Sequence, residues 1–141
     1  MRVTHQTGTR RWLLLPAAIL VLSGLAAGCS SSKPAYCTDA ANLKTSVSNL
    51  GNVNVAANGL GSLQAALSSV QANASSFASD AKSAFPSQTT ALQNSVSSLG
   101  AAITSAKGQP PLTAATAVAS AVAQVKTSAS AVQSAVSGTC Q

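Results

Sequence analysis

Apolar residues recur at alternating steps of three and four in four separate segments, which is the spacing of one face of an α-helix. Four stripes of this kind predict an all-α fold, an antiparallel four-helix up-down bundle whose first helix is short. The stripes consist of Tyr36, Ala40, Leu43, Val47 and Leu50; of Leu60, Leu63, Leu67, Val70, Ala74, Phe77, Ala81 and Ala84; of Phe85, Thr89, Leu92, Val96, Leu99, Ile103 and Ala106; and of Ala115, Val118, Val122, Val125, Ala129, Val132 and Val136.

Glycine and proline separate these segments. Breaks are expected at Gly51, at Pro86, at Gly108 with Pro110 and Pro111, and at Gly138. We expect Gly51 to close the first helix in a left-handed conformation. The stretch 51–61, rich in Asn and Gly, is expected to be a loop, which Val53 and Val55 can hold against the core.

The first 28 residues have the organisation of an export signal. Three arginines, Arg2, Arg10 and Arg11, precede an apolar run and then small residues. The run from Trp12 to Ala27 is shorter than the roughly 20 apolar residues that span a bilayer, which favours a cleaved signal over a permanent anchor. The adjacent arginines leave both the general and the twin-arginine export routes open.

The end of this segment, Leu25-Ala26-Ala27-Gly28-Cys29, resembles the lipobox of bacterial lipoproteins. The resemblance implies that Cys29 is diacylated on its sulfur, by palmitate or a similar acyl chain, and becomes the mature N-terminus. It also implies attachment to the cell membrane on the extracytoplasmic face, for which two acyl chains suffice. The alternative is a secreted protein, in which Cys29 is an ordinary thiol beside a cleavage site after Ala27.

The supply of reactive side chains after residue 28 is small. It comprises five Lys and two Asp, with no His, Glu or Arg, and gives a net charge of +3 that is too scattered to indicate nucleic-acid binding. Without His there is no Ser-His or Cys-His nucleophile pair, and two carboxylates are a poor metal site. Residues 79–82 and 30–33 fit S-x-x-K, but the companion motifs of penicillin-interacting enzymes are missing. We therefore expect no catalytic residue, metal or cofactor.

The other two cysteines, Cys37 and Cys140, stand at the start of the first helix and after the end of the fourth. In an up-down bundle with an even number of helices these places lie at the same end, which predicts a disulfide between them. Closing a loop of about 100 residues is worth up to about 4.7 kcal/mol in the chain-entropy model. An exported location permits the bond. The alternative is two unpaired thiols.

The predicted organisation is a signal peptide over 1–28, a tether over 29–36 and a helical bundle over 37–141. The residues between Cys29 and Cys37 span at most about 28 Å when extended. We therefore expect the disulfide end of the bundle to lie close to the bilayer.

Several short motifs resemble the small Ala/Ser-rich helical lipoproteins and secreted proteins of high-GC actinobacteria. They are Gly28-Cys29-Ser30-Ser31-Ser32, Tyr36-Cys37, Phe85-Pro86-Ser87 and the final Cys140. The resemblance implies a place in the cell envelope, and no general biochemical activity is attached to such proteins.

Two functions are compatible with these features, and an enzyme is a distant third. The first is a non-catalytic, monomeric envelope protein that presents its bundle to an envelope protein or cell-wall partner. The alternative is a carrier of a lipid or other apolar ligand, which an apolar pocket of several hundred Å³ between the helices would favour. The sequence assigns no ligand-binding residue.

Overall fold

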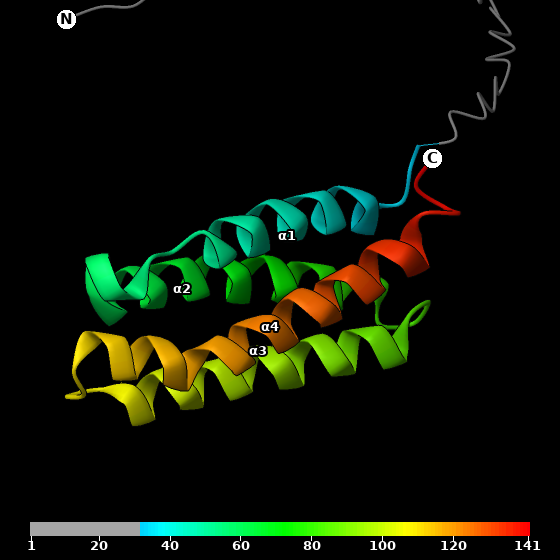
Figure 1. Cartoon of the computed structure of the whole chain (residues 1–141). Helices are drawn as coiled ribbons and strands as arrows, with labels where there is room; N and C mark the ends of the chain where they lie inside the picture. The colour runs from blue at the N-terminus through cyan, green and yellow to red at the C-terminus, as the bar shows by residue number, and fades with distance from the viewer. Residues whose placement is uncertain (1–31) are drawn as a thin grey trace, which may run out of the picture. The chain divides into compact units, whose positions relative to one another are not determined.

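The computed structural model describes residues 32–141, which form four α-helices and, within that range, no strand (Figure 1). Helix α1 spans Ala35–Gly51, α2 spans Val55–Ala81, α3 spans Pro86–Ala106 and α4 spans Pro111–Val136. The chain reverses direction at each of the three short connections, so successive helices run up and down (Figure 1). The predicted all-α bundle with a short first helix is confirmed.

The predicted signal peptide, Cys29 and the first residues of the tether lie outside the residues that the structure describes. Helix α1 begins at Ala35, directly after Pro34. The helix thus includes Ala35 and Tyr36, which were expected in the tether over 29–36. Cys37 lies in the first turn of α1.

The helix ends follow from local chemistry. The side-chain oxygen of Asn54 accepts a hydrogen bond from the backbone N–H of Ala57 at 3.0 Å and so caps α2. Helices α3 and α4 begin with Pro86 and Pro111, at the position where a helix needs no N–H donor. Gly108, between α3 and α4, has a φ of 81°, which favours glycine. The breaks predicted at these places are confirmed.

The expectations for residues 51–61 are wrong in two respects. Gly51 does not adopt a left-handed conformation; it is the last residue of α1, and Asn52 follows it with φ −93° and ψ −2°. The loop comprises only 52–54, because the Asn54 cap starts α2 at Val55. The bend that the glycines suggested lies inside α2, where Gly59 has φ 73° and ψ 174°. A glycine can adopt these angles without the clash of a side chain.

The predicted stripes point into the core. Six large side chains with at most 1% exposure occupy its centre, namely Leu43, Leu50, Leu63, Phe77, Leu92 and Leu99. Val55 is buried and Val53 packs on the core, as predicted. Six predicted positions differ. Ala84 is exposed because α2 ends at Ala81, and five others are only partly buried, namely Tyr36, Leu60, Phe85, Ala115 and Val122. In α4 the buried face is rotated from the predicted one near the start of the helix, since Ala114 and Ala121 are buried where the stripe placed Ala115 and Val122.

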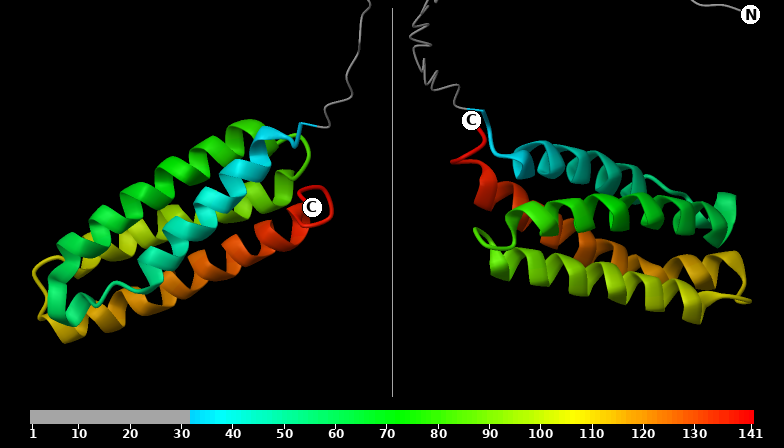
Figure 2. Two further views of the ribbon diagram at one scale, coloured as in Figure 1. Left: turned by 90° about the horizontal axis from the view of Figure 1, so that it is seen from above. Right: turned by 180° about the vertical axis from the view of Figure 1, so that it is seen from behind.

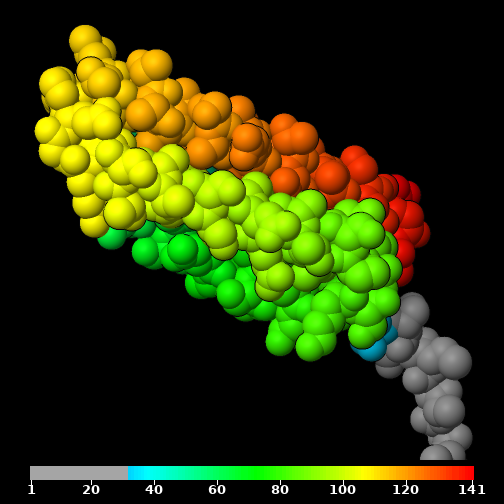
Figure 3. All heavy atoms as spheres, turned by 90° about the horizontal axis from the view of Figure 1, so that it is seen from below, coloured from blue at the N-terminus to red at the C-terminus, as the bar shows by residue number. Residues whose placement is uncertain are grey.

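Each helix contacts its neighbours in the order α1, α2, α3, α4 and back to α1. Helices α2 and α4 also contact each other across the bundle, whereas α1 and α3 do not. Figures 2 and 3 show α3 and α4 packed side by side along their length. Helix α1 has 17 residues against 26 in α4, a difference of about 13 Å at 1.5 Å per residue. The first half of α4 therefore faces the connection between α1 and α2 rather than α1 itself (Figure 1).

Among residues 32–141, none of the helices has both the length and the apolar content that crossing a bilayer requires.

Candidate functional site

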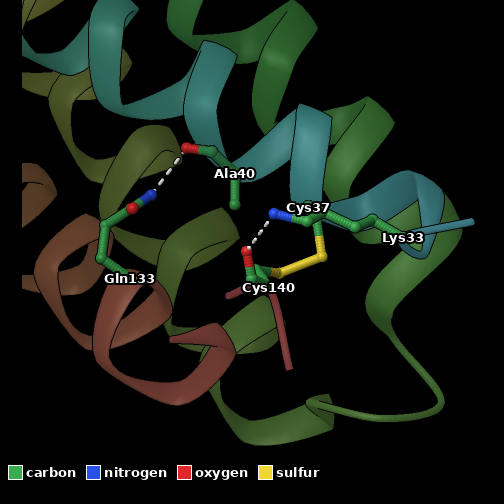
Figure 4. Close-up of a disulfide and its surroundings, with 5 residues drawn as sticks. All are labelled: Lys33, Cys37, Ala40, Gln133 and Cys140. Carbon is green, nitrogen blue, oxygen red and sulfur yellow. Dashed lines mark hydrogen bonds between the residues drawn. A yellow bond between two sulfur atoms is a disulfide. The ribbon is translucent and has the colours of Figure 1, made fainter. Parts of the chain in front are cut away.

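A disulfide joins Cys37 in the first turn of α1 to Cys140 beyond the end of α4 (Figure 4). The two Cα atoms are 5.4 Å apart, a separation that disulfides ordinarily have. The predicted pairing is confirmed. It fixes the C-terminal end of the described chain to the place where α1 begins.

Two hydrogen bonds support the same junction (Figure 4). The Lys33 ammonium donates to the backbone oxygen of Cys140 at 3.0 Å. The Gln133 side-chain amide donates to the backbone oxygen of Ala40 at 2.6 Å. A side-chain donor on α4 thus binds a carbonyl of α1, and the two helices are fixed to each other where the groove described below begins.

The aromatic rings of Tyr36 and Phe85 also lie at this end. Their centroids are 5.4 Å apart and the rings meet edge to face, an arrangement worth about 0.5–1.5 kcal/mol beyond burial. Tyr36 belongs to the first turn of α1 and Phe85 to the connection between α2 and α3. The contact therefore attaches the start of α1 to the second connection as well.

The two acidic residues of the chain, Asp39 and Asp80, meet at the same end. Partial burial raises the pKa of Asp39 above its ordinary value of 3.8, and the charge of Asp80 and a hydrogen bond between the two carboxyl groups add to the rise. Among residues 32–141 no third carboxylate, histidine or cysteine joins them in a cluster that could hold a metal ion. Both negative charges of the bundle are therefore confined to the disulfide end.

The S-x-x-K segment at 79–82 does not form a site in the structure. Ser79 and Lys82 are both exposed, and Lys82 follows the last residue of α2. No hydrogen bond connects Ser79 to Lys82 in the described chain. In the second match, 30–33, Ser30 lies outside the described residues and Lys33 is bonded to the backbone of Cys140.

A groove runs along the outer side of the contact between α1 and α4. Its first half, nearer the disulfide, has a volume of about 450 Å³. This polar half carries two ammonium groups, three hydroxyls and two amides. Its polar side chains are Lys44, Ser48, Asn52, Lys126, Ser130, Gln133 and Ser134. No acidic side chain lines it. The polar half is therefore a positively charged hollow.

Lys126 lies across the end of α1. A Cβ atom built on Gly51 would be 3.5 Å from Cδ of Lys126 and 3.7 Å from its Nζ. The ammonium therefore sits beside the last turn of α1, where unpaired carbonyls give a helix a partial negative charge.

The second half of the groove is apolar and has a volume of about 400 Å³. It lies between α4 on one side and, on the other, the end of α1, the 52–54 connection and the start of α2. Its lining includes Val53, Val55, Ala56, Ala115, Ala119 and Val122. Gly51 lines both halves, so the two hollows meet beside Lys126.

The groove is a candidate site that the sequence analysis missed. One signal for it was present: Leu112, Ala115, Ala119, Val122 and Lys126 follow one another at steps of three and four, on one face of α4. This face lies beside the core stripe of α4. Whether it is covered by α1 or lines a hollow depends on where α1 ends. That end was placed correctly near Leu50, but the consequence for α4 required the packing of the two helices.

Cys29, the predicted lipidation site, lies outside the described residues, and the structure places Cys37 and Cys140 together as described above. Comparison with protein-family models, with curated proteins and with solved structures found no match to this chain.

Proposed function

We propose that the protein is a lipid-anchored, non-catalytic protein of the bacterial cell envelope whose helical bundle binds a partner on its surface. The observation that carries the binding role is the groove between α1 and α4. It combines two lysines with an adjoining apolar hollow on a bundle whose core is filled by its own side chains. Anchoring is supported by the Leu25–Cys29 sequence.

The tether relates the two parts of this proposal. From Cys29 to Ala35, where α1 begins, the chain extends at most about 21 Å. An acylated Cys29 would therefore hold the disulfide end of the bundle near the bilayer, on the extracytoplasmic face. The groove lies on the side of the bundle and extends from near the disulfide end toward the opposite end. This position leaves the groove accessible to a partner in the envelope.

The non-catalytic role is supported by the available side chains. From Cys29 to Gln141 the chain has no His, Glu or Arg. Its two carboxylates lie beside each other at the disulfide end, while the groove has lysines, hydroxyls and amides. Lys44 and Lys126 are both exposed, which favours binding.

A carrier role is the second candidate, and the apolar half of the groove favours one form of it. Leu43, Leu92 and Phe77 are fully buried between the helices, where a ligand inside the bundle would have to displace them. Of the side chains that line the apolar half, Ala119 is exposed and Ala115 and Val122 are only partly buried. A carried ligand would thus lie along the surface seam between α1 and α4.

The anchor is tested in the original host by metabolic labelling with an alkyne-bearing fatty acid. The full chain should incorporate label and sediment with membranes, and Cys29→Ala should lose both properties. Ser30→Ala is the matched control and should behave as the unaltered chain. A Cys29→Ala protein that is still labelled and membrane-bound would contradict the anchor, and an unlabelled full chain in the medium would indicate the secreted alternative.

The binding role is tested by native mass spectrometry of the full chain extracted from the host envelope. A partner protein, a cell-wall fragment or a lipid that co-purifies should be lost from a variant with an altered groove, Lys44→Gln with Lys126→Gln. Repeated recovery of the bare protein would contradict binding.

A further inference from the structure

We propose that the groove between α1 and α4 binds a single-chain amphiphilic anion, a molecule with one acyl tail and a carboxylate or phosphate head group. This inference rests on the proposed binding role and names the class of ligand. The head group would lie between Lys44 and Lys126, and the tail would lie over the apolar half of the groove.

The charge of the polar half favours an anion. Lys44 on α1 and Lys126 on α4 line the same hollow, and no acidic side chain lines it with them. The two acidic residues of the chain, Asp39 and Asp80, lie toward the disulfide and interact with each other there. Two ammonium groups that line one hollow can both form charge-assisted hydrogen bonds to an anion between them.

Hydroxyl groups add hydrogen-bond donors to the same hollow. Ser48, Ser130 and Ser134 line it, from α1 and α4 respectively. The Gln133 amide, by contrast, is already bonded to the backbone of Ala40. Carboxylate and phosphate oxygens accept hydrogen bonds from ammonium and hydroxyl groups, which matches the donors present.

The apolar half favours an acyl tail. Val53 and Val55 on one side, and Ala115, Ala119 and Val122 on the other, line it without any charged side chain. Its volume of about 400 Å³ lies within the range of small-molecule sites. Small side chains on α4 leave the room that an occupant would fill.

The length of the apolar half also fits one acyl chain. From Ala115 to Lys126 the axis of α4 rises about 16 Å. One leaflet contributes about half of a hydrocarbon core of about 30 Å, so an extended acyl chain covers a similar distance. A chain whose head group lies at Lys126 would therefore end near Ala115.

The direction in which the groove runs indicates whether such a ligand is a free molecule or a lipid that remains in the bilayer. The polar half, with the two lysines, is lined by residues of 44–52 and 126–134. The apolar half is lined by residues of 50–63 and 115–122 and lies farther from the disulfide. With the disulfide end near the bilayer, a tail in the groove points away from the membrane. The occupant is therefore a free molecule, and not a lipid that remains in the bilayer.

The test uses the mature full chain in nanodiscs of zwitterionic lipid and a dodecanoic acid with a diazirine at the end of its tail. After irradiation, the labelled peptides are mapped by mass spectrometry. Label is expected in the segments 50–56 and 112–122, which flank the apolar half. The corresponding diazirine dodecanol, which has the same tail and no charge, should label these segments about fivefold less at equal concentration.

Matched variants separate charge at this site from charge in general. Lys44→Gln and Lys126→Gln should each weaken the apparent affinity about fivefold, and added salt should weaken binding of the unaltered chain. The double variant Lys82→Gln with Lys107→Gln removes two lysines that do not line the groove, and should leave labelling unchanged. Ala119→Phe fills the apolar half from an exposed position and should abolish labelling there. Helicity measured by circular dichroism checks that each variant folds.

Three results would overturn the proposal: equal labelling by the acid and the alcohol, labelling that is insensitive to Lys44→Gln and Lys126→Gln, or labelling elsewhere on the bundle. Binding only to anionic vesicles, with no label from the free acid, would also overturn it, because it would indicate contact with a bilayer surface. The same labelling can be measured with the Cys29→Ala chain in solution, without nanodiscs, so failure of the anchor and failure of the ligand class are distinguishable.

Discussion

The carboxyl group of Asp39 on α1 lies next to that of Asp80 on α2, where their charges repel each other and where a protonated Asp39 can donate a hydrogen bond to Asp80. They are the only acidic residues of the chain, and they lie beside each other although the chain also has lysines with which an acidic residue can pair. Partial burial and the neighbouring carboxylate both disfavour ionisation of Asp39, which raises its pKa in the folded state. We therefore expect the pair to favour the folded state less at neutral pH than in acid.

The pH dependence of stability follows from this shift. The folded pKa of Asp39 is raised above the unfolded value of 3.8, so between the two values the folded state binds more protons than the unfolded state. Its contribution to stability is therefore greatest in acid and is lost as pH rises through that interval. We expect Asp80→Asn to remove part of this loss and to raise the midpoint of urea unfolding at pH 7. Measurements from pH 3 to pH 7 on both proteins check this. A variant that is no more stable than the parent at pH 7 would contradict the unfavourable pairing.

The disulfide should contribute strongly to stability, because Cys37 and Cys140 are 103 residues apart in the sequence. We expect Cys37→Ala with Cys140→Ala to lower the free energy of unfolding by about 2–4 kcal/mol. Urea denaturation of both proteins measures this difference. As a control, treating the double variant with reductant should change nothing, whereas the same treatment should destabilise the parent. Equal stability of the oxidised parent and the variant would contradict the role assigned to the bond.

Two glycines of α2 offer a matched comparison. Gly59 has φ 73° and ψ 174°, whereas Gly61 has no positive φ, and a Cβ on either would meet no atom within 4 Å. Gly59→Ala should therefore destabilise the protein by about 1–3 kcal/mol through the backbone alone. Gly61→Ala should stabilise it by about 0.4–1 kcal/mol. Thermal unfolding of the two variants checks the opposite signs, and a stabilising Gly59→Ala would mean that α2 is continuous through this residue.

Thr89, near the start of α3, is 4% exposed, and its hydroxyl has no hydrogen-bond partner within the described chain. Burying an unpaired hydroxyl costs about 1–3 kcal/mol, and valine has nearly the same shape. We expect Thr89→Val to raise the free energy of unfolding by about 1 kcal/mol. Thr90→Val, at the exposed neighbouring position, should change it by less than about 0.5 kcal/mol. A destabilising Thr89→Val would indicate that the hydroxyl has a partner in solution.

The four helices could be predicted because their periodicity is a local property. Leu43, Leu92 and Val132 are buried where their stripes required. The Cys37–Cys140 pairing was predictable as well, since an even number of alternating helices brings the two chain ends together. Residues 51–61 were harder to predict, because glycines mark loops and helix bends alike. Only the Asn54 cap and the conformation of Gly59 distinguish the two cases here.

The sequence by itself determined that this chain forms helices, which faces of them are buried, where they end to within a few residues, and which cysteines can pair. These properties depend on residue spacing and on the backbone preferences of glycine and proline, which act over a few positions. Only the tertiary structure decided that Lys44 and Lys126 share one hollow, that an apolar hollow adjoins it, and that Asp39 meets Asp80. Such relationships depend on the relative rotation and offset of packed helices, which arise from the fit of many side chains at once.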